Sequence, residues 1–480
     1  MPESPIFLKL RCPAPSRELP RMSRFVQQLV RVGPRFLPFA DAASDELPLR
    51  KLLRLSLFQV AVGMAIVLLV GTLNRVMIVE LKVPASVVGI MISLPLLFAP
   101  FRALIGFKSD THVSALGWRR VPWIYRGTLA LWGGFAIMPF ALIVLGGQGY
   151  AEGQPLWLGV SSAALAFLMV GGGVHTIQTV GLALATDLAP REDQPKVVGL
   201  MYVVLLVSMI FSSIGFGWLL DPYYDAQLIK VISGVAVAVF FLNMIALWKM
   251  EPRNRAYTIK PEKEPEFSDH WREFISRENA LHGLIVIALG TLGFGMADVI
   301  LEPYGGQVLS MTVAETTRLT ATFAGGGLVG FWLASWVLGR GFDPLRMAFL
   351  GAAAGLPGFF AIMGATGMTS TWIFILGTLT VGFGGGLFSH GTLTATMRLA
   401  PKEQVGLALG AWGAVQATAA GIGIASAGII RDLLQALPDL GAYGPGAPYL
   451  AVFALEAAFL LVTMIVILPL LRSALAARRL

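Results

Sequence analysis

The chain has 480 residues, of which 56% are hydrophobic and only 13% are charged, and its formal net charge at pH 7 is +8. This composition excludes an ordinary soluble globular protein. Twelve apolar runs of about twenty residues, each long enough to cross the hydrocarbon of a bilayer, recur along the sequence. They predict an all-α polytopic membrane protein with twelve transmembrane helices.

The first 54 residues precede the first apolar run and are predicted to form a cytoplasmic arm. Basic residues are dispersed among prolines and polar residues in this arm, without the compact apolar stretch of a cleaved signal peptide. The segment Met22 to Leu37 is amphipathic enough to lie on an anionic membrane surface, and a disordered tail is the alternative. The single cysteine, Cys12, lies in the arm and excludes an internal disulfide.

The apolar runs divide into two sets of six, which predict an N-terminal half at residues 55–250 and a C-terminal half at residues 280–472. A charged cytoplasmic linker at residues 251–279 joins the halves, and residues 473–480 form a cytoplasmic tail. The predicted spans are Leu55–Val79, Val87–Phe107, Val121–Leu145, Leu156–Thr186, Val197–Leu220, Leu228–Trp248, Leu281–Leu301, Leu319–Leu338, Met347–Met363, Trp372–Met397, Val405–Leu433 and Tyr449–Leu471.

Positive charge is concentrated on alternate connections, which predicts the orientation of the bundle. Most Lys and Arg residues lie in the arm, in the connection at 102–126, in the linker region and in the tail. The connections at 146–155, 221–227, 303–317, 364–371 and 438–448 are nearly bare of positive charge. By the positive-inside rule both termini are cytoplasmic. The net charge follows from this topology, so it does not require a nucleic-acid partner.

Two short motifs occur once in each half, at equivalent places. Leu188-Ala-Pro-Arg-Glu192 returns as Leu399-Ala-Pro-Lys-Glu403, and Gly106-x3-Asp110 returns as Gly339-x3-Asp343. Such repeats indicate a duplication of six helices in the same orientation. This is the pseudo-symmetric six-plus-six arrangement of major facilitator proteins.

The connection between the second and third spans also resembles the loop motif of the major facilitator superfamily. Gly106 and Asp110 are followed by Gly117, Arg119 and Arg120, but extra residues separate the acid from the basic pair. In the superfamily this loop locks the cytoplasmic side in one state. The altered spacing puts ordinary alternating access in doubt.

Charged residues interrupt the first and seventh apolar runs. Asn74, Arg75 and Glu80 lie near the end of the first run, and Asp298 and Glu302 lie in the seventh. The two acids are four residues apart, so on a helix they share one face. Acids in a membrane are candidates for function, and Asp298 is the predicted partner of Arg75.

The sequence after Glu302 predicts where the seventh helix ends. Pro303 and the pair Gly305-Gly306 follow at once and are expected to stop the helix. The alternative to a functional role is therefore that Glu302 and Pro303 anchor a turn at the membrane interface.

Four longer motifs resemble one branch of the superfamily. They are Leu73-Asn-Arg-Val-Met-Ile-Val-Glu80, Ile105–Asp110 with Gly117–Pro122, His175–Thr179 with Ala185–Pro190, and Asp298–Gln307. Together they resemble the PucC and LhaA family of phototrophic bacteria, the bacteriochlorophyll-delivery proteins. The resemblance extends from Leu37 to about Pro469.

This resemblance implies an assembly factor for light-harvesting complex 1 or 2. Its members are thought to bind bacteriochlorophyll, with carotenoid as a second pigment, and to hand it to the antenna alpha and beta polypeptides. Further partners implied by the resemblance are bacteriochlorophyll synthase, the membrane insertion machinery and the reaction centre. The implied location is the inner, intracytoplasmic photosynthetic membrane.

Two of the five histidines lie inside apolar runs. His175 and His390 occupy related places in the fourth and tenth spans, beside the glycine triplets 171–173 and 384–386. A neutral imidazole is a candidate axial ligand for the magnesium of a chlorin, and the glycines would leave room for a flat ring. The alternatives are that the glycines pack helices and that each imidazole hydrogen-bonds a neighbouring helix.

No enzymatic motif occurs in the chain: it has no Walker loop, no dinucleotide fingerprint and no Cys or His cluster with metal spacing. We therefore expect a protein that is not an enzyme. The alternatives to an assembly factor are a proton-coupled permease, with Asp298 and Glu302 as proton carriers, and a scaffold without a small ligand. The apolar runs contain few polar residues, which favours an apolar ligand or a protein partner.

Overall fold

The computed structural model describes residues 47–97, 102, 105, 108–109, 112, 114, 117–147, 151–190, 193–253, 275–276, 279–399, 405–437 and 444–477. Eleven helices in this part of the chain are long and apolar enough to cross a membrane, and the shorter α4 (Ala85–Leu97) takes the place of the second predicted span. The twelve-span, all-α prediction is confirmed. No strand occurs among these residues.

Nine of the spans are single continuous helices, and six of these begin and end within three residues of the predicted bounds. The continuous helices are α6 (Val121–Gly146), α7 (Leu156–Leu188), α8 (Gln194–Leu219), α9 (Asp225–Leu247), α13 (Val313–Leu338), α14 (Pro344–Met368), α15 (Thr371–Leu399), α16 (Val405–Gln435) and α18 (Ala447–Ala477). The largest differences are at α13, which begins six residues earlier than predicted, at α18, which ends six residues later, and at α14, which ends five residues later.

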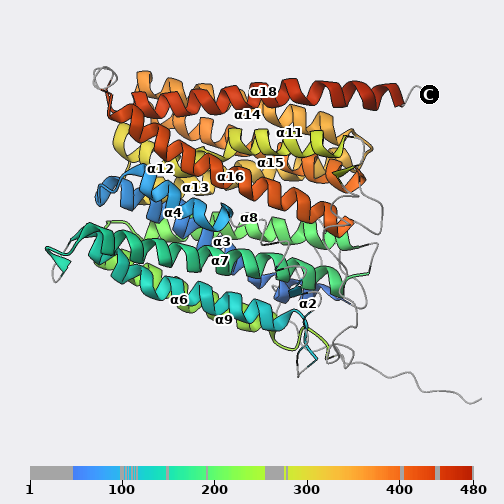
Figure 1. The fold of residues 1–480 in the computed structure, drawn as a ribbon, viewed down its shortest axis with the longest axis horizontal. Helices are drawn as coiled ribbons and strands as arrows, with labels where there is room; N and C mark the ends of the chain where they lie inside the picture. Colours follow the sequence, from blue (N-terminus) through green and yellow to red (C-terminus); the bar gives the residue numbers. More distant parts are fainter. Residues whose placement is uncertain are drawn as a thin grey trace, which may run out of the picture.

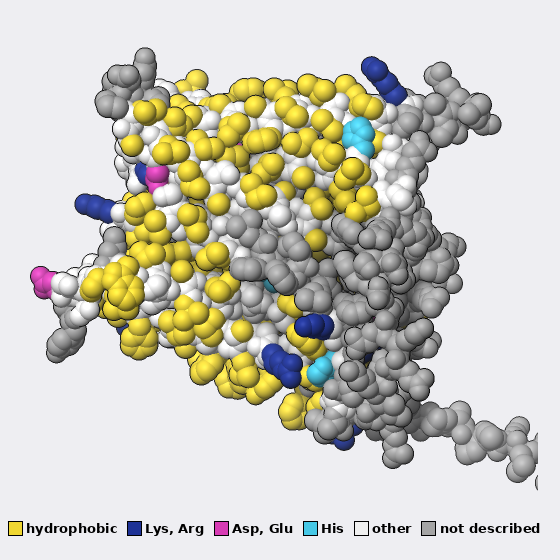
Figure 2. Space-filling view, viewed as in Figure 1, with side chains coloured by type: hydrophobic (Ala, Val, Ile, Leu, Met, Phe, Trp, Pro, Cys, Tyr) yellow, Lys and Arg dark blue, Asp and Glu magenta, His cyan; other side chains and the backbone are white. Residues whose placement is uncertain are grey.

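The two halves of the chain lie side by side, with their helices running along a common direction (Figure 1). The N-terminal half is coloured blue to green and the C-terminal half yellow to red. Two helix pairs form the main contact between the halves: α4 packs on α16, and α8 packs on α13. Hydrophobic side chains dominate the visible surface of the bundle (Figure 2). This is the surface expected of a protein surrounded by lipid.

The first span is composed of four short elements. They are α2 (Leu49–Leu55), α3 (Leu57–Ile66), η2 (Val67–Leu73) and η3 (Val76–Glu80), and the last two are π-helical. The helix therefore begins within the predicted arm. Wide π turns are rare in proteins, and those that occur often lie at functional sites. Here they flank Asn74 and Arg75.

The seventh span is broken, but at a different residue from the one predicted. It consists of α11 (Ala280–Gly295) and α12 (Ala297–Val308), which meet at Met296. The prediction that Pro303 and the Gly305-Gly306 pair end the helix was wrong, because α12 continues through all three residues. Proline is tolerated in membrane helices where neighbouring elements satisfy the freed backbone groups.

The glycine pair serves close packing instead of a turn. A Cβ atom on Gly305 would lie 3.1 Å from the sulfur of Met311 and 3.2 Å from the ring of Phe374. A Cβ atom on Gly306 would lie 3.1 Å from the guanidinium group of Arg75. Both glycines therefore let other groups approach the α12 backbone.

Glycines also set the distance between α13 and α15. A Cβ atom on Gly382 would lie only 2.1 Å from the carbonyl oxygen of Phe323, and one on Gly326 would lie 2.1 Å from the carbonyl oxygen of Leu379. Close contact of backbones at small residues is the usual way in which membrane helices associate. The two helices cannot separate locally without losing these contacts.

We predict that Gly382→Ala destabilises the protein by about 1–3 kcal/mol, because overpacking of a tight contact forces the backbone apart. The matched control is Gly364→Ala on α14, where nothing lies within 4 Å of the added Cβ. Thermal unfolding in mild detergent, followed by circular dichroism, measures both. Equal melting temperatures for the two variants would contradict the packing assigned to α13 and α15.

Candidate functional site

Seven hydrogen bonds between the halves lie at the end of the bundle that is opposite to the C-terminus (Figure 1). They join η2, η3, α4 and α8 to α12, α13 and α16. The pairs are Thr72 with Thr317, Asn74 with the Asp298 carbonyl, Arg75 with the Met311 carbonyl, the Ser86 amide with Asp432, Ser213 with the Thr317 carbonyl, and Arg318 with both the Gly217 carbonyl and Asp221. By the predicted orientation this end is extracytoplasmic.

Arg75 is the buried cation of this interface, with only 4% of its surface exposed. Its guanidinium group forms a salt bridge with Glu80 and donates a hydrogen bond of 3.1 Å to the carbonyl oxygen of Met311. The prediction that Asp298 is its partner was wrong. The π-helical turns explain the difference, since they align residues five apart, and Glu80 is five residues after Arg75.

The two acids of α12 lie inside the bundle. Glu302 is 3% exposed, and its Oε1 accepts a hydrogen bond of 3.0 Å from the hydroxyl group of Thr320. Its Oε2 has no hydrogen-bond partner. Asp298 is half-buried, and its carbonyl oxygen accepts a hydrogen bond of 2.9 Å from the side chain of Asn74. An anchor at the membrane interface is therefore excluded for Glu302.

A third buried acid, Glu456 on α18, was missed in the sequence. Its side chain is fully buried, and neither carboxyl oxygen has a hydrogen-bond partner. The carboxyl group faces the backbone of Ala297 without making a hydrogen bond to it, and it interacts electrostatically with Asp298. It therefore lies against the junction of α11 and α12. A lone acid in the middle of the run Tyr449–Leu471 was the signal available.

His175 and His390 have similar immediate surroundings. Each lies on a long helix, α7 or α15, and is partly buried, and the Nδ1 atom of each ring is buried without a hydrogen-bond partner. Hydrogen bonding to a neighbouring helix through Nδ1, which was the alternative to metal ligation, is not observed among the described residues. Both rings thus retain a nitrogen that is not used in the fold.

The glycine triplets mostly pack helices. A Cβ atom on Gly171 would lie 2.2 Å from Pro95, and one on Gly173 would lie 2.6 Å from the Gly127 carbonyl oxygen. The outer glycines of the second triplet are equally tight, since a Cβ atom on Gly384 would lie 2.7 Å from the Gly351 carbonyl oxygen, and one on Gly386 would lie 2.3 Å from the Gly327 carbonyl oxygen. The expectation that both triplets leave room for a flat ring was wrong for these four positions.

One glycine beside His175 is open, and this separates the two histidines. Nothing lies within 4 Å of a Cβ atom built on Gly172, which is exposed and three residues before His175 on the same helix face. In contrast, the ring of Phe331 lies on the ring of His390, with 4.2 Å between their centroids. The helix face is therefore open at Gly172, one turn before His175, whereas Phe331 covers one side of the His390 ring.

Arg102 is a further polar residue near His175 that the sequence did not single out. It donates hydrogen bonds of 3.0 Å to the Thr179 hydroxyl group and 3.2 Å to the Gln178 side-chain carbonyl. It interacts electrostatically with His175 and with Tyr202 on α8. Because Arg102 lies in the basic connection at 102–126, the sequence indicated only one more positive charge on the cytoplasmic side.

The loop motif is partly outside the described residues, since Gly106 and Asp110 are not described. Gly117 has a φ of 71°, which favours glycine. Asp187 accepts hydrogen bonds from the side chains of Arg119, at 2.6 Å, and Arg120, at 2.9 Å, and Glu251 accepts hydrogen bonds from both backbone amides. Asp187 belongs to the N-terminal half and Glu251 is the first residue of the linker, so these contacts tie the basic pair to the end of α7 and to the start of the linker.

In the repeated motif of the C-terminal half, Asp343 precedes a helix. The side chain of Asp343 accepts hydrogen bonds from the backbone amides of Leu345, at 3.0 Å, and Arg346, at 3.1 Å. It is therefore the N-cap of α14.

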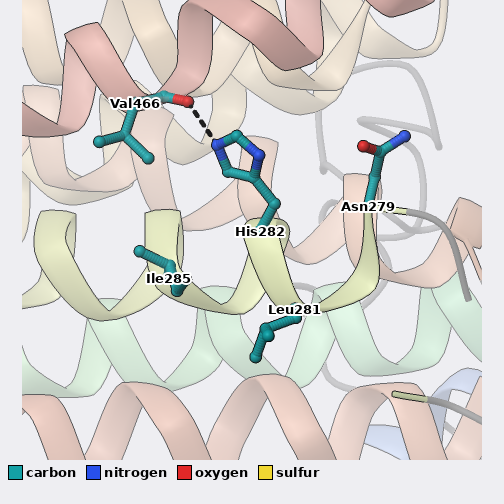
Figure 3. Close-up of a pocket in the computed structure, with 5 residues that line it drawn as sticks. All are labelled: Asn279, Leu281, His282, Ile285 and Val466. Atoms are coloured by element: carbon teal, nitrogen blue, oxygen red, sulfur yellow. Dashed lines mark hydrogen bonds between the residues drawn. The ribbon is translucent and has the colours of Figure 1, made fainter. Parts of the chain in front are cut away.

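A surface groove of about 410 Å³ lies between the start of α11 and α18 (Figure 3). Asn279, Leu281, His282, Ile285 and Val466 line it. The Nε2 atom of His282 lies 2.8 Å from the Val466 carbonyl oxygen, to which it is hydrogen-bonded. The imidazole therefore joins two helices, and the other lining groups offer no second polar side chain apart from Asn279.

Comparison of the sequence with known families gives a match to the family described as "PUCC protein" over residues 72–475. A relative named "Protein PucC" from Cereibacter sphaeroides is 93% identical, over 96% of this chain and 100% of that protein. Another "Protein PucC", from Rhodobacter capsulatus, is 58% identical over 93% of this chain and 98% of that protein. A more distant relative from Rhodobacter capsulatus, named "Bacteriochlorophyll synthase 44.5 kDa chain", is 27% identical over 82% of this chain and 90% of that protein.

Solved structures with a similar fold are transporters. The nucleoside transporter NupG has a TM-score of 0.63 at 13% identity, over 87% of this chain and 99% of that one. The POT family transporter PepTSo also has a TM-score of 0.63 at 13% identity, over 88% of this chain and 98% of that one. At this identity the likeness shows the fold alone, and it agrees with the six-plus-six helical bundle predicted from the sequence.

We predict that Arg75 and Glu80 are energetically coupled, whereas Arg75 and Asp298 are not. Residues in contact show interaction energies of about 0.5–3 kcal/mol, and independent sites add to within about 0.5 kcal/mol. Double-mutant cycles with Arg75→Gln, Glu80→Gln and Asp298→Asn, read out by the free energy of unfolding in detergent, measure both pairs. Coupling of Arg75 to Asp298 equal to its coupling to Glu80 would contradict the pairing described.

Proposed function

The chain belongs to the PucC family, and we propose that it is a non-enzymatic assembly factor for light-harvesting antenna complexes, which binds bacteriochlorophyll and delivers it to the antenna polypeptides. Family membership supports the role in assembly. A relative that carries the name of a bacteriochlorophyll synthase chain supports a connection with the pigment. The transporter-like fold supplies a large apolar surface within the membrane, where pigment and antenna helices also lie.

The observation that carries the pigment proposal is the surroundings of His175. Its ring has a buried nitrogen without a hydrogen-bond partner, and the helix face beside it is open at Gly172. Bound bacteriochlorophyll would supply a magnesium ion with an axial position that an imidazole nitrogen can fill. A partly buried histidine whose Nδ1 has no hydrogen-bond partner fits this requirement, because metal-ligating histidines must be neutral.

Arg102 is the second residue of the proposed pigment site. Its guanidinium group is held by Gln178 and Thr179 on the same helix as His175, so its position is fixed by the fold. A fixed donor near the ring can orient a ligand that carries carbonyl groups at its edge. His390, which we first considered equivalent to His175, is the weaker candidate because Phe331 lies on its ring.

The proposed clients are the alpha and beta polypeptides of light-harvesting complex 1 or 2, in the intracytoplasmic photosynthetic membrane. Large apolar side chains are exposed on the bundle, including Phe211 and Trp218 on α8 and Trp332 and Trp336 on α13. These two helices are adjacent. Single membrane helices such as those of antenna polypeptides can pack on a surface of this kind. Carotenoid is proposed only as a second pigment.

The second candidate function is a proton-coupled permease. The superfamily fold and the buried acids Glu302 and Glu456 favour it. Reconstitution into vesicles separates the two functions, since a permease shows uptake driven by a proton gradient. Substituting Asp298→Asn or Glu302→Gln should abolish such uptake, whereas for an assembly factor these changes act through structure or partner docking.

We predict that deletion of the gene in its phototrophic host lowers the amount of one antenna complex and leaves pigment synthesis largely intact. Antenna absorption and total extracted bacteriochlorophyll are measured separately in the deletion strain and in a complemented strain. Normal antenna levels in a clean deletion without a compensating relative would overturn the proposed function.

We predict that the protein purified in mild detergent retains bacteriochlorophyll, and that His175→Ala lowers the pigment-to-protein ratio. Altering the coordination of a bound metal typically costs on the order of tenfold or more in affinity. The matched control is His390→Ala, which should keep the ratio and the long-wavelength absorption band. A full ratio and an unshifted band in His175→Ala would show that His175 is not the ligand. Absence of pigment from the wild type would favour a scaffold.

A further inference from the structure

The groove between α11 and α18 contains a histidine whose second ring nitrogen is accessible. The Nε2 atom of His282 lies 2.8 Å from the Val466 carbonyl oxygen. Because a carbonyl oxygen only accepts hydrogen bonds, Nε2 carries the proton and donates it. In the neutral ring the Nδ1 atom then keeps its lone pair. Figure 3 shows this nitrogen facing away from Val466 and toward Asn279. The hydrogen bond therefore fixes both the tautomer and the direction of the lone pair.

The position of His282 within α11 leaves this nitrogen uncovered by its own helix. The helix begins at Ala280, so His282 is its third residue and no earlier turn of α11 lies under the ring. Side chains of a helix lean toward its N-terminus, so the imidazole lies beside the start of α11. Its Nδ1 atom has no partner among the described residues and is not buried, unlike the Nδ1 atoms of His175 and His390. A ligand in the groove can therefore reach it.

The walls of the groove are apolar and lie on the outer surface of the bundle. Leu281, Ile285 and Val466 contribute the apolar lining of its 410 Å³. Leu281 is 56% exposed and Ile285 is 44% exposed, so both face the acyl chains when the protein is in a membrane. The predicted orientation places the start of α11 at the cytoplasmic boundary of the membrane. An amphiphile in the membrane can thus enter the groove from the side.

Asn279 adds a second polar group beside the accessible nitrogen. Its φ is 66°, a conformation that asparagine tolerates better than most residues, and its side chain does not cap α11. The carboxamide lines the groove on the side that the Nδ1 atom faces (Figure 3). A carboxamide can donate a hydrogen bond to a carbonyl group or accept one from a hydroxyl group. The groove therefore combines a fixed lone pair, an amide and apolar walls.

This combination favours a ligand with a metal centre. Metal-ligating histidines almost always donate their other ring N–H to a carboxylate, a backbone carbonyl or water, and His282 has this arrangement with Val466. A bare ion is excluded, because among the described residues no three of His, Cys, Asp and Glu converge on one. A magnesium tetrapyrrole needs only one axial ligand from the protein. We propose that the groove is a second bacteriochlorophyll site, with the Nδ1 atom of His282 as the magnesium ligand and Asn279 as a hydrogen-bond partner of the pigment.

The second site differs from the first in its access to the membrane. His175 lies on α7 of the N-terminal half, whereas His282 lies on α11 of the C-terminal half. Because the groove is on the outer surface, a pigment bound there can pass to another membrane protein without separation of the halves. The inference rests on the proposed function for the identity of the pigment, and it adds a place from which the pigment can be delivered.

The first test titrates the full-length protein in mild detergent with bacteriochlorophyll and with its magnesium-free form. The parent protein carries His175→Ala, so that the first site does not contribute. Adding His282→Ala should weaken binding of the magnesium pigment about tenfold or more and leave binding of the magnesium-free form unchanged. Asn279→Gly, which keeps the positive φ, should weaken both. The matched control, His112→Ala, removes another partly exposed histidine and should change neither. Equal binding of the two pigments by the parent would overturn the proposal and assign the groove to a lipid.

The second test separates coordination from the structural role of the hydrogen bond to Val466. His282→Gln keeps a donor for the Val466 carbonyl and removes the nitrogen ligand. It should melt at the temperature of the parent, yet the absorption band of bound bacteriochlorophyll should lose the shift caused by a nitrogen ligand. A band identical with that of the parent would refute ligation by His282 and leave the proposed function standing. If neither the parent nor the wild type binds bacteriochlorophyll, the pigment part of the proposed function fails as well, and antenna levels in the deletion strain test assembly separately.

Discussion

The structure depends on one constraint: a charge within the bilayer must face the protein and find a partner there. Arg75 meets this constraint at the contact between the halves, where it is bound to Glu80 and to the Met311 carbonyl oxygen. Its side chain lies against Gly306, and that contact requires a residue without a side chain. The surroundings of Arg75 therefore combine three features: the wide turns of η2 and η3, the glycines of α12, and the loop after α12.

The two ends of the bundle differ in the polar contacts that the structure describes there. At one end seven hydrogen bonds join the halves, and several of them use backbone carbonyl oxygens. At the other end the basic pair Arg119 and Arg120 is bound by Asp187 of the N-terminal half and by Glu251 at the start of the linker. The hydrogen bonds described between the halves thus lie at one end, in addition to the packing of α4 on α16 and of α8 on α13.

Sequence reasoning predicted the fold well because each membrane helix is indicated by about twenty consecutive, mostly apolar residues, so that a few exceptions do not hide it. Twelve apolar runs, the alternation of basic connections and the repeated motifs all gave the same answer. It failed where the local backbone departs from an α-helix. The π turns around Arg75 align it with Glu80, and the break at Met296 lets α12 continue through Pro303. Neither departure was recognised in the sequence, so the partner of Arg75 and the end of the seventh helix were predicted wrongly.

Candidate ligand sites show a second limit of sequence reasoning. A glycine beside a histidine indicates that something comes close, but it does not distinguish a ligand from a neighbouring helix. At Gly384 and Gly386 the neighbour is backbone, at Gly171 it is Pro95, and only Gly172 is open. Glu456 was visible as a lone acid in an apolar run, yet its importance depends on α18 facing the junction of α11 and α12. Because packing decides which glycines are covered by neighbouring helices and which polar residues lack partners, it also decides where this fold can accept a ligand.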